Sequence, residues 1–196
     1  MLEKINNKII PFLDNIFVGK RKKYSLFFTA MIDSVIAILP TDLIVVYYFL
    51  RIKKASIFIQ SFWIGLGSAI GGSLLYFFGS NILDFFPSIL NSEYYLKIKE
   101  ILDYSILIQF VLITFFAFSS TIPFTWLSII LGILNVNLSV YIIGVFLGRG
   151  LRFGLIAILS HKYGKKSLKL MRKYIWELFL IILFLALLYL IYKLWI

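Results

Sequence analysis

Four charged residues, Asp33, Asp42, Arg149 and Arg152, lie in otherwise apolar parts of the sequence. A charged side chain at the centre of a membrane-spanning helix costs about 2.5–3.5 kcal/mol on insertion scales, so such residues mark paired or functional positions. Carboxyl groups removed from water take up protons more readily, and guanidinium groups bind phosphate through two parallel hydrogen bonds. The four residues therefore predict a partly hydrated cavity in which the arginines contact phosphate and the aspartates exchange protons or line the cavity.

Two simpler interpretations of these charges stay open at the level of sequence. The aspartates and arginines could form structural salt bridges, or Arg149 and Arg152 could extend along apolar surface to the cytoplasmic interface. The two arginines are three residues apart, so a helix would place both near one face. Which interpretation holds depends on how the surrounding helices bring the charges together.

The composition is that of an integral membrane protein. Of the 196 residues, 61% are hydrophobic and 15% are charged, whereas about 25% are charged in soluble domains. The absence of cysteine excludes disulfides, thiolate catalysis and cysteine-ligated metals. Because no nucleophile–base pair or metal-ligand cluster stands out, we expect no enzyme activity, no metal and no cofactor. The net charge of +11 indicates loops on the cytoplasmic face, not a nucleic-acid partner.

Four apolar blocks provide the helices that must position the charges, and they cover residues 24–50, 55–80, 104–148 and 175–196. About 20 helical residues cross the hydrocarbon core, so the second and fourth blocks are single spans, and the fourth is a C-terminal transmembrane helix. The third block has about twice that length. The first contains Asp33, Pro40 and Asp42, which one lipid-facing helix would not tolerate.

An internal repeat is indicated when the chain is laid over itself with Pro40 on Pro123. This alignment also pairs three sets of glycines: Gly65 with Gly148, Gly67 with Gly150, and Gly71 with Gly154. Each half, 24–80 and 104–160, then consists of an apolar segment broken at proline, a return segment and a glycine-rich span. We predict an all-helical inverted repeat of two re-entrant hairpins, each followed by a spanning helix, with these glycines in helix packing. The hairpin breaks are assigned to Pro40, Pro123, Thr121 and Thr125.

The basic clusters predict an orientation for this membrane core, which we place at residues 24–174. Residues 1–23 carry apolar side chains at helical spacing together with six basic residues, and we expect an amphipathic helix on the membrane surface. Six further basic residues lie in 162–173, and the connection at 81–103 is rich in acids. By the positive-inside rule the N-terminus is cytoplasmic and the C-terminus is outside.

Several segments resemble the DedA family, which is also called the VTT-domain or SNARE-associated family, and in particular its short YqaA-like branch. The resemblance covers residues 30–165 and is carried by four segments: Asp33-Ser-Val-Ile-Ala-Ile-Leu-Pro40-Thr-Asp42, the glycine-rich Gly65–Gly72, Thr121-Ile-Pro123-Phe-Thr125, and Gly148-Arg149-Gly150-Leu-Arg152-Phe153. Asp33 takes a position where the family commonly has Glu. The larger branch carries arginines in its second hairpin, and this chain has none between Phe115 and Gly132.

The resemblance implies a multi-pass protein of the bacterial inner membrane that translocates lipids. Its partners would be phospholipids or polyprenyl phosphates, and some family members use protons as a coupling ion. Whether the chain forms a homo-oligomer stays open. The resemblance assigns Asp33, Asp42, Arg149 and Arg152 to the substrate or proton pathway. Two other functions remain open: a small-solute or ion transporter of the same fold, and a non-transporting membrane scaffold or assembly factor.

Overall fold

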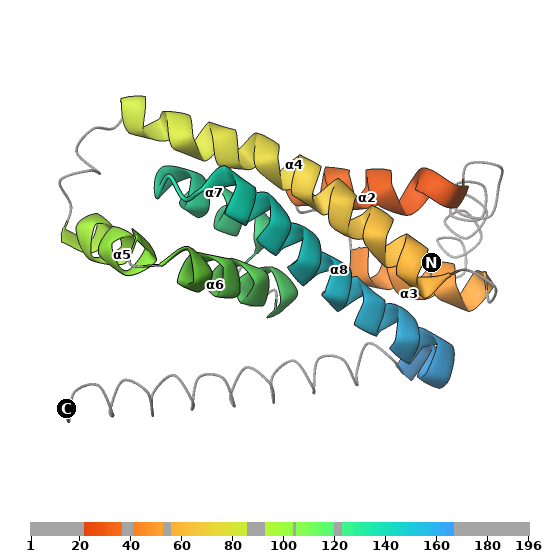
Figure 1. Cartoon of the computed structure of the whole chain (residues 1–196). Helices are drawn as coiled ribbons and strands as arrows, with labels where there is room; N and C mark the ends of the chain where they lie inside the picture. The colour runs from red at the N-terminus through yellow and green to blue at the C-terminus, as the bar shows by residue number, and fades with distance from the viewer. Residues whose placement is uncertain are drawn as a thin grey trace, which may run out of the picture.

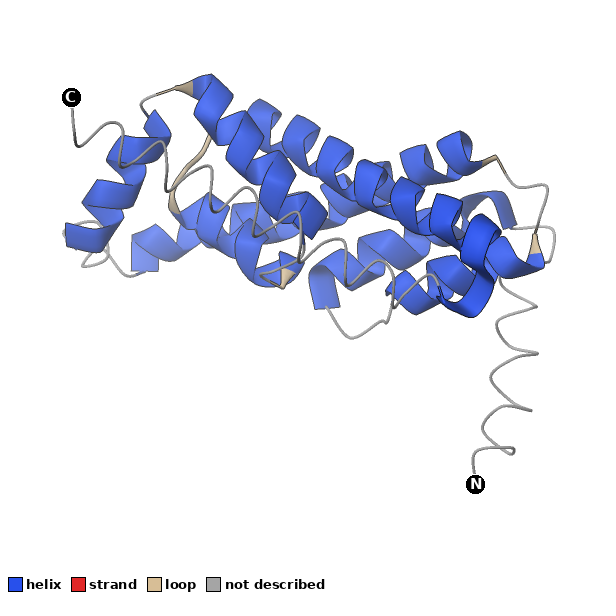
Figure 2. Cartoon of the chain, turned by 90° about the horizontal axis from the view of Figure 1, so that it is seen from below, coloured by secondary structure: helices blue, strands red, loops and turns tan. Residues whose placement is uncertain are grey.

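The computed structural model describes residues 22–36, 41–52, 56–85, 93–103, 105–119 and 123–166. Within these ranges every regular element is a helix, as Figure 2 shows, which confirms the all-helical fold predicted from the sequence. Four predictions fall outside the described residues: the surface helix in 1–23 apart from its last two residues, the C-terminal transmembrane helix at 175–196, and the breaks at Pro40 and Thr121.

Two long helices, α4 (Ile57–Phe85) and α8 (Leu138–Tyr163), form the centre of the fold. The segments Ile57–Ile82 and Leu138–Tyr163 are long and apolar enough to cross a membrane, each with 26 residues. At 1.5 Å per residue, 26 residues extend about 39 Å, whereas the hydrocarbon core is about 30 Å thick. The start of α8 is set by Asn137, whose side chain accepts hydrogen bonds from the backbone N–H groups of Ser139 and Val140.

The structure describes two pairs of short helices, and the residues between the members of each pair, 37–40 and 120–122, lie outside the described ranges. The first pair is α2 (Lys22–Ile36) and α3 (Thr41–Arg51), and the second is α6 (Ile106–Ser119) and α7 (Phe124–Ile133). Pro123 lacks an N–H group and stands at the N-cap of α7, where a helix can begin without that donor. Each of these helices has at most 15 residues and is therefore shorter than a membrane span.

The short helices are divided between the two long ones (Figure 1). Helices α2 and α7 pack along α4, and helices α6 and α3 pack along α8. The last turn of α2 lies beside the first turn of α7, where the Thr125 Oγ1 donates a hydrogen bond to the Ser34 carbonyl at 3.4 Å. Each long helix is thus accompanied by two short helices from different pairs, and these meet near its middle.

Glycines bring the backbones of these helices close together, as the sequence predicted for four of the six assigned positions. A Cβ at Gly67 or Gly71 would overlap a carbonyl of α2, and one at Gly148 would lie 2.5 Å from the Thr114 carbonyl of α6. Gly65 similarly faces the Phe146 carbonyl of α8, at 2.6 Å. Side chains at these positions would force the helices apart.

The glycine alignment that suggested the repeat does not match positions with equivalent contacts. Gly65 faces α8, whereas its matched residue Gly148 faces α6. At Gly150 a Cβ would be in ordinary contact, 3.5 Å from the Ser61 carbonyl, so close packing does not require that glycine. Gly154 is intermediate, with a Cβ 3.1 Å from the Ser61 Oγ.

One helix was missed in the connection between the two halves. Helix α5 (Glu93–Asp103) lies in the acid-rich connection at 81–103, for which we predicted no helix. Tyr95 and Leu102, seven residues apart, are buried on one face of α5, and the Leu102 carbonyl accepts a hydrogen bond from Gln109 Nε2 at 3.1 Å. This helical spacing was a signal that the high charge of the segment obscured.

The buried apolar side chains form two separate clusters. One cluster is built from α5, α6, α7 and the adjoining halves of α4 and α8, around Tyr141, Ile113 and Leu127. The other is built from α2, α3 and the opposite halves of α4 and α8, around Phe49 and Phe153. The buried polar side chains between these clusters form the candidate site.

Candidate functional site

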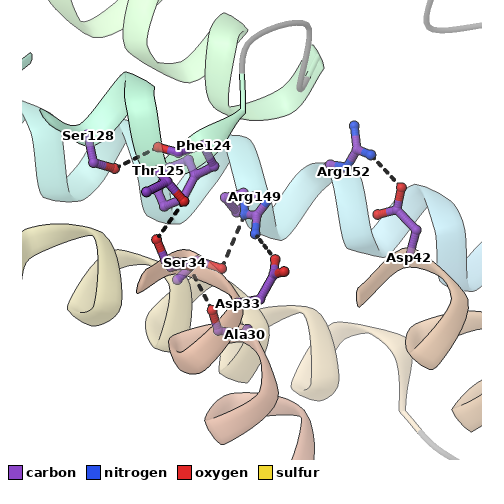
Figure 3. Close-up of polar contacts among 10 residues, drawn as sticks. Ala30, Asp33, Ser34, Asp42, Phe124, Thr125, Ser128, Arg149 and Arg152 are labelled. Carbon is purple, nitrogen blue, oxygen red and sulfur yellow. Dashed lines mark hydrogen bonds and ion pairs between the residues drawn. The ribbon is translucent and has the colours of Figure 1, made fainter. Parts of the chain in front are cut away.

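Both sequence-predicted arginines lie near the middle of α8. Arg149 and Arg152 are within two residues of the midpoint of Leu138–Tyr163, and Ser68 is equally close to the midpoint of Ile57–Ile82 in α4. Each arginine forms an ion pair with one of the two predicted aspartates (Figure 3). The structure therefore brings together all four charges that the sequence singled out, as two pairs.

Arg149 is enclosed by four helices. Its Nη2 donates to Asp33 Oδ2 of α2 at 3.0 Å, and its Nε donates to Ser68 Oγ of α4 at 3.2 Å. The guanidinium also lies 4.7 Å from the ring centre of Phe124, at the start of α7, and 5.0 Å from that of Phe153 in α8. The side chains of Arg149 and Asp33 are 5% and 14% exposed, so this pair is closed to solvent.

Arg152 connects the end of α6 to the start of α3. Its Nη2 donates to Asp42 Oδ2 at 2.6 Å. Its Nη1 lies 3.1 Å from the Phe118 carbonyl and 3.2 Å from the Ser119 carbonyl, which belong to the last turn of α6. The Arg152 side chain is 9% exposed, but that of Asp42 is 38% exposed, so the carboxylate is the accessible part of this pair.

The two pairs also differ in their relation to the helix dipoles. Asp42 is in the first turn of α3 and Arg152 contacts the last carbonyls of α6, so both charges are stabilised by the adjacent helix ends. Asp33 is the fourth residue from the end of α2, and Arg149 lies beside the first residue of α7. A negative charge near the C-terminal end of a helix and a positive charge near an N-terminal end are both disfavoured by the helix dipole. The Arg149–Asp33 pair is therefore stabilised by its direct hydrogen-bond partners and not by the helix ends.

The geometry removes one of the alternatives that the sequence left open. Neither arginine extends to an end of α8, because both side chains are buried at its middle. Structural ion pairing is present in both cases. A role in ligand binding is open mainly to the Arg152–Asp42 pair, since the Nε of Arg152 is buried without a hydrogen-bond partner among the described residues and the carboxylate of Asp42 is accessible.

Sequence reasoning missed the residues that surround the charges. Ser68 lies among the glycines of α4, which we interpreted as a packing segment, and Phe124 and Phe153 are two of 20 phenylalanines. The carbonyls of Phe118 and Ser119 carry no sequence signal. Of the residues assigned to the hairpin breaks, Pro123 stands at the N-cap of α7. Thr125 does not lie at a break, because it is the second residue of α7, where its Oγ1 donates to the Ser34 carbonyl.

The site has no net charge, but its individual charged groups can each bind a group of opposite charge. Two guanidinium groups and two carboxylates lie in one layer between apolar clusters. A phosphate could replace the Asp42 carboxylate on Arg152, and a cationic group could bind the carboxylate. Within the described residues, no group of three or more His, Cys, Asp or Glu side chains could hold a metal ion.

Comparisons with family models, with curated proteins and with solved structures found no match to this chain.

Proposed function

We propose that this chain is a multi-pass membrane protein of the DedA type, built as an inverted repeat of two re-entrant hairpins. The antiparallel arrangement of α4 and α8 supports this proposal, since Gly65 lies near Gly150 and Gly72 lies near Tyr141. The division of each short pair between the two long helices is also what an inverted repeat requires. Large apolar side chains such as Phe58, Leu74 and Leu151 are exposed and would face lipid.

The charge distribution supports a cytoplasmic location for one end of the bundle. Arg51 and Lys162 lie at the ends of α3 and α8, which pack side by side, and Lys166 follows in the adjoining 3-10 helix. Helix α5, which follows the opposite end of α4, carries two basic residues, Lys97 and Lys99, beside three acids, Glu93, Glu100 and Asp103. By the positive-inside rule the end with more basic residues is cytoplasmic, so we propose that α5 lies outside and that the ends of α3 and α8 lie in the cytoplasm.

In this orientation the two ion pairs lie at the midplane of the bilayer, and we propose that they serve lipid translocation. A phospholipid or polyprenyl-phosphate headgroup would cross the polar layer while its tails stay in lipid. The observation that carries the proposal is the Arg152–Asp42 pair, a charged pair at the middle of α8 whose carboxylate is 38% exposed. The Arg149–Asp33 pair, by contrast, is buried among its partners, with side chains that are 5% and 14% exposed.

The experiment uses purified protein in liposomes that contain lipids with fluorescent headgroups, in which an added reductant bleaches only the outer leaflet. Lipids with ethanolamine, glycerol and polyprenyl-phosphate headgroups are compared with and without a proton gradient. We expect Asp42→Asn and Arg152→Gln to lower the flip rate by about tenfold or more, which corresponds to about 1.4 kcal/mol in the barrier.

The matched control is Glu93→Gln, which removes a carboxylate from an ion pair that is 68% and 77% exposed on α5. Its flip rate should equal that of the unmodified protein. Flip rates equal to those of empty liposomes for every headgroup would contradict lipid translocation. Flux of a small solute under the same conditions would then identify a transporter, and the absence of all flux would favour a scaffold.

A further inference from the structure

The Arg152 guanidinium has a donor without a partner beside the donor that binds Asp42. Its Nη2 donates to Asp42 Oδ2 at 2.6 Å (Figure 3), and its Nη1 contacts the Phe118 and Ser119 carbonyls. The Nε is buried and has no hydrogen-bond partner among the described residues. Nε and Nη2 form one edge of a guanidinium, and such an edge can bind two oxygens of a phosphate. Asp42 therefore uses half of an edge that suits a phosphate.

The Asp42 carboxylate has no second cation nearby in the described part of the chain. Arg149, the other basic residue at the middle of α8, is already paired with another aspartate. The remaining basic residues of the described ranges lie at the start of α2, at the end of α3, on α5 or from the last turn of α8 onward. The segments that adjoin the start of α3 and the end of α6, 37–40 and 120–122, contain no basic residue. When an anion takes Arg152, these parts of the chain offer Asp42 no replacement.

The loss of its counter-charge is unfavourable for a carboxylate at this depth, because the surroundings replace little of the water that the charge has lost. The Asp42 side chain is 38% exposed, so a ligand can reach it. Its place in the first turn of α3 favours a negative charge there. A ligand that brings a phosphate for Arg152 and an ammonium group for Asp42 replaces one ion pair by two. A ligand with a phosphate alone leaves the carboxylate unpaired.

We infer that Asp42 selects the ligand of this site by charge, and that the ligand carries a phosphate and an ammonium group joined by a short link, as in phosphoethanolamine. The phosphate binds the Nε–Nη2 edge of Arg152, and the ammonium group binds the Asp42 carboxylate. The inference rests on the proposed function for its membrane setting and for the lipid. Among the lipids considered there, it favours phospholipids with a zwitterionic headgroup over polyprenyl phosphates, which bring no cation.

Binding is measured by titration calorimetry on the full chain in detergent, with short-chain phospholipids that differ in their headgroups. The ethanolamine headgroup is compared with N-acetylethanolamine, which keeps the phosphate and nearly the same size but loses the positive charge. A glycerol headgroup is the second comparison. We expect the ethanolamine lipid to bind about tenfold more tightly than the other two, because a hydrogen bond between charged groups contributes about this factor or more.

The variants test whether Asp42 is the source of this preference. Asp42→Asn should make the three affinities nearly equal, whereas Asp42→Glu, which keeps the carboxylate, should retain the preference. Glu93→Gln on α5 is the matched control and should retain it as well. Equal affinities in the unmodified protein would overturn the inference, and so would a preference that persists in folded Asp42→Asn. The first comparison needs no substitution, so it decides even where Asp42→Asn does not fold.

Flip rates of lipids with the same headgroups separate this inference from the proposed function. The fluorophore is placed on an acyl chain, so that the ammonium group stays free. A binding preference without flipping would overturn lipid translocation and leave the ligand class. Flipping with equal affinities for the three headgroups would overturn the ligand class and leave lipid translocation.

The same chemistry is present in a free solute, and soluble glycerophosphoethanolamine is the probe that separates the two sources. We expect it to bind more weakly than the ethanolamine lipid and not to cross the liposome membrane with the protein. Equal binding together with flux of this solute would support the ligand class but overturn the lipid as its source.

Discussion

The two ion pairs at the centre of this molecule consist of the same residue types in different surroundings. Arg149 is bound by Asp33 and Ser68 and enclosed by two phenylalanine rings. The charges of Asp33 and Arg149 are disfavoured by the dipoles of the helix ends beside them. The Arg152–Asp42 pair agrees with the adjacent helix dipoles and exposes its carboxylate. The comparison supports our proposal that Arg149–Asp33 holds four helices together and that Arg152–Asp42 exchanges its partners.

The largest expected effect comes from breaking the enclosed pair on one side only. Asp33→Asn leaves the Arg149 guanidinium buried without its counter-charge, and removal of one partner of a buried pair costs about 3–5 kcal/mol. We expect little folded protein, measured as the monodisperse fraction and the thermal unfolding midpoint in detergent. The control replaces both partners, because Asp33→Leu with Arg149→Met removes both charges and should recover most of the lost stability. Failure of the double variant to recover stability would show that the charges themselves are required.

The next effect concerns the hydroxyl group that satisfies Arg149 Nε. Ser68 is fully buried, and Ser68→Ala removes a hydrogen bond to a charged group, which contributes about 1.5–3 kcal/mol. The unfolding midpoint should fall, and lipid flux per folded molecule should stay near that of the unmodified protein. A loss of flux without a loss of stability would reverse the roles assigned to the two pairs.

A glycine comparison tests how α2 brings Asp33 to the enclosed pair. A Cβ at Gly71 would overlap the Met31 carbonyl, two residues before Asp33, whereas a Cβ at Gly150 would be in ordinary contact at 3.5 Å. Gly71→Ala should destabilise the protein by about 1–3 kcal/mol, as overpacking usually does. Gly150→Ala is the matched control and should unfold at nearly the unmodified midpoint. Equal midpoints for the two variants would contradict the close packing of α2 on α4.

The smallest effect on stability is expected at the open pair. The Asp42 carboxylate is 38% exposed, whereas the Asp33 carboxylate is 14% exposed, so loss of the Asp42 charge should cost less than loss of the Asp33 charge. In Asp42→Asn the guanidinium also keeps the Phe118 and Ser119 carbonyls as partners. The unfolding midpoint should therefore change much less than in Asp33→Asn. A midpoint as low as that of Asp33→Asn would mean that both pairs are structural.

The sequence was sufficient to find the charges, but not to pair them. Asp33 and Arg152 could be identified locally, because a charge in an apolar segment must have a partner or a function. Which aspartate meets which arginine depends on α2 packing along α4 and α3 along α8, which are contacts between distant segments. The alignment of Pro40 with Pro123 predicted two broken halves, but the glycines that it pairs make different contacts, because helix contacts and not sequence offsets decide where a side chain is excluded.

We propose that the Arg152–Asp42 pair acts in transport and that the Arg149–Asp33 pair holds the fold. The most direct test of this proposal is lipid flux per folded molecule for Asp42→Asn beside the double variant of Asp33→Leu with Arg149→Met, in the same liposomes and with the same labelled lipid. We expect Asp42→Asn to unfold near the unmodified midpoint but to flip lipid about tenfold or more slowly, which is a change of about 1.4 kcal/mol in the barrier. The double variant should keep most of the flux. Unmodified flux in folded Asp42→Asn, together with loss of flux in a folded double variant, would contradict it.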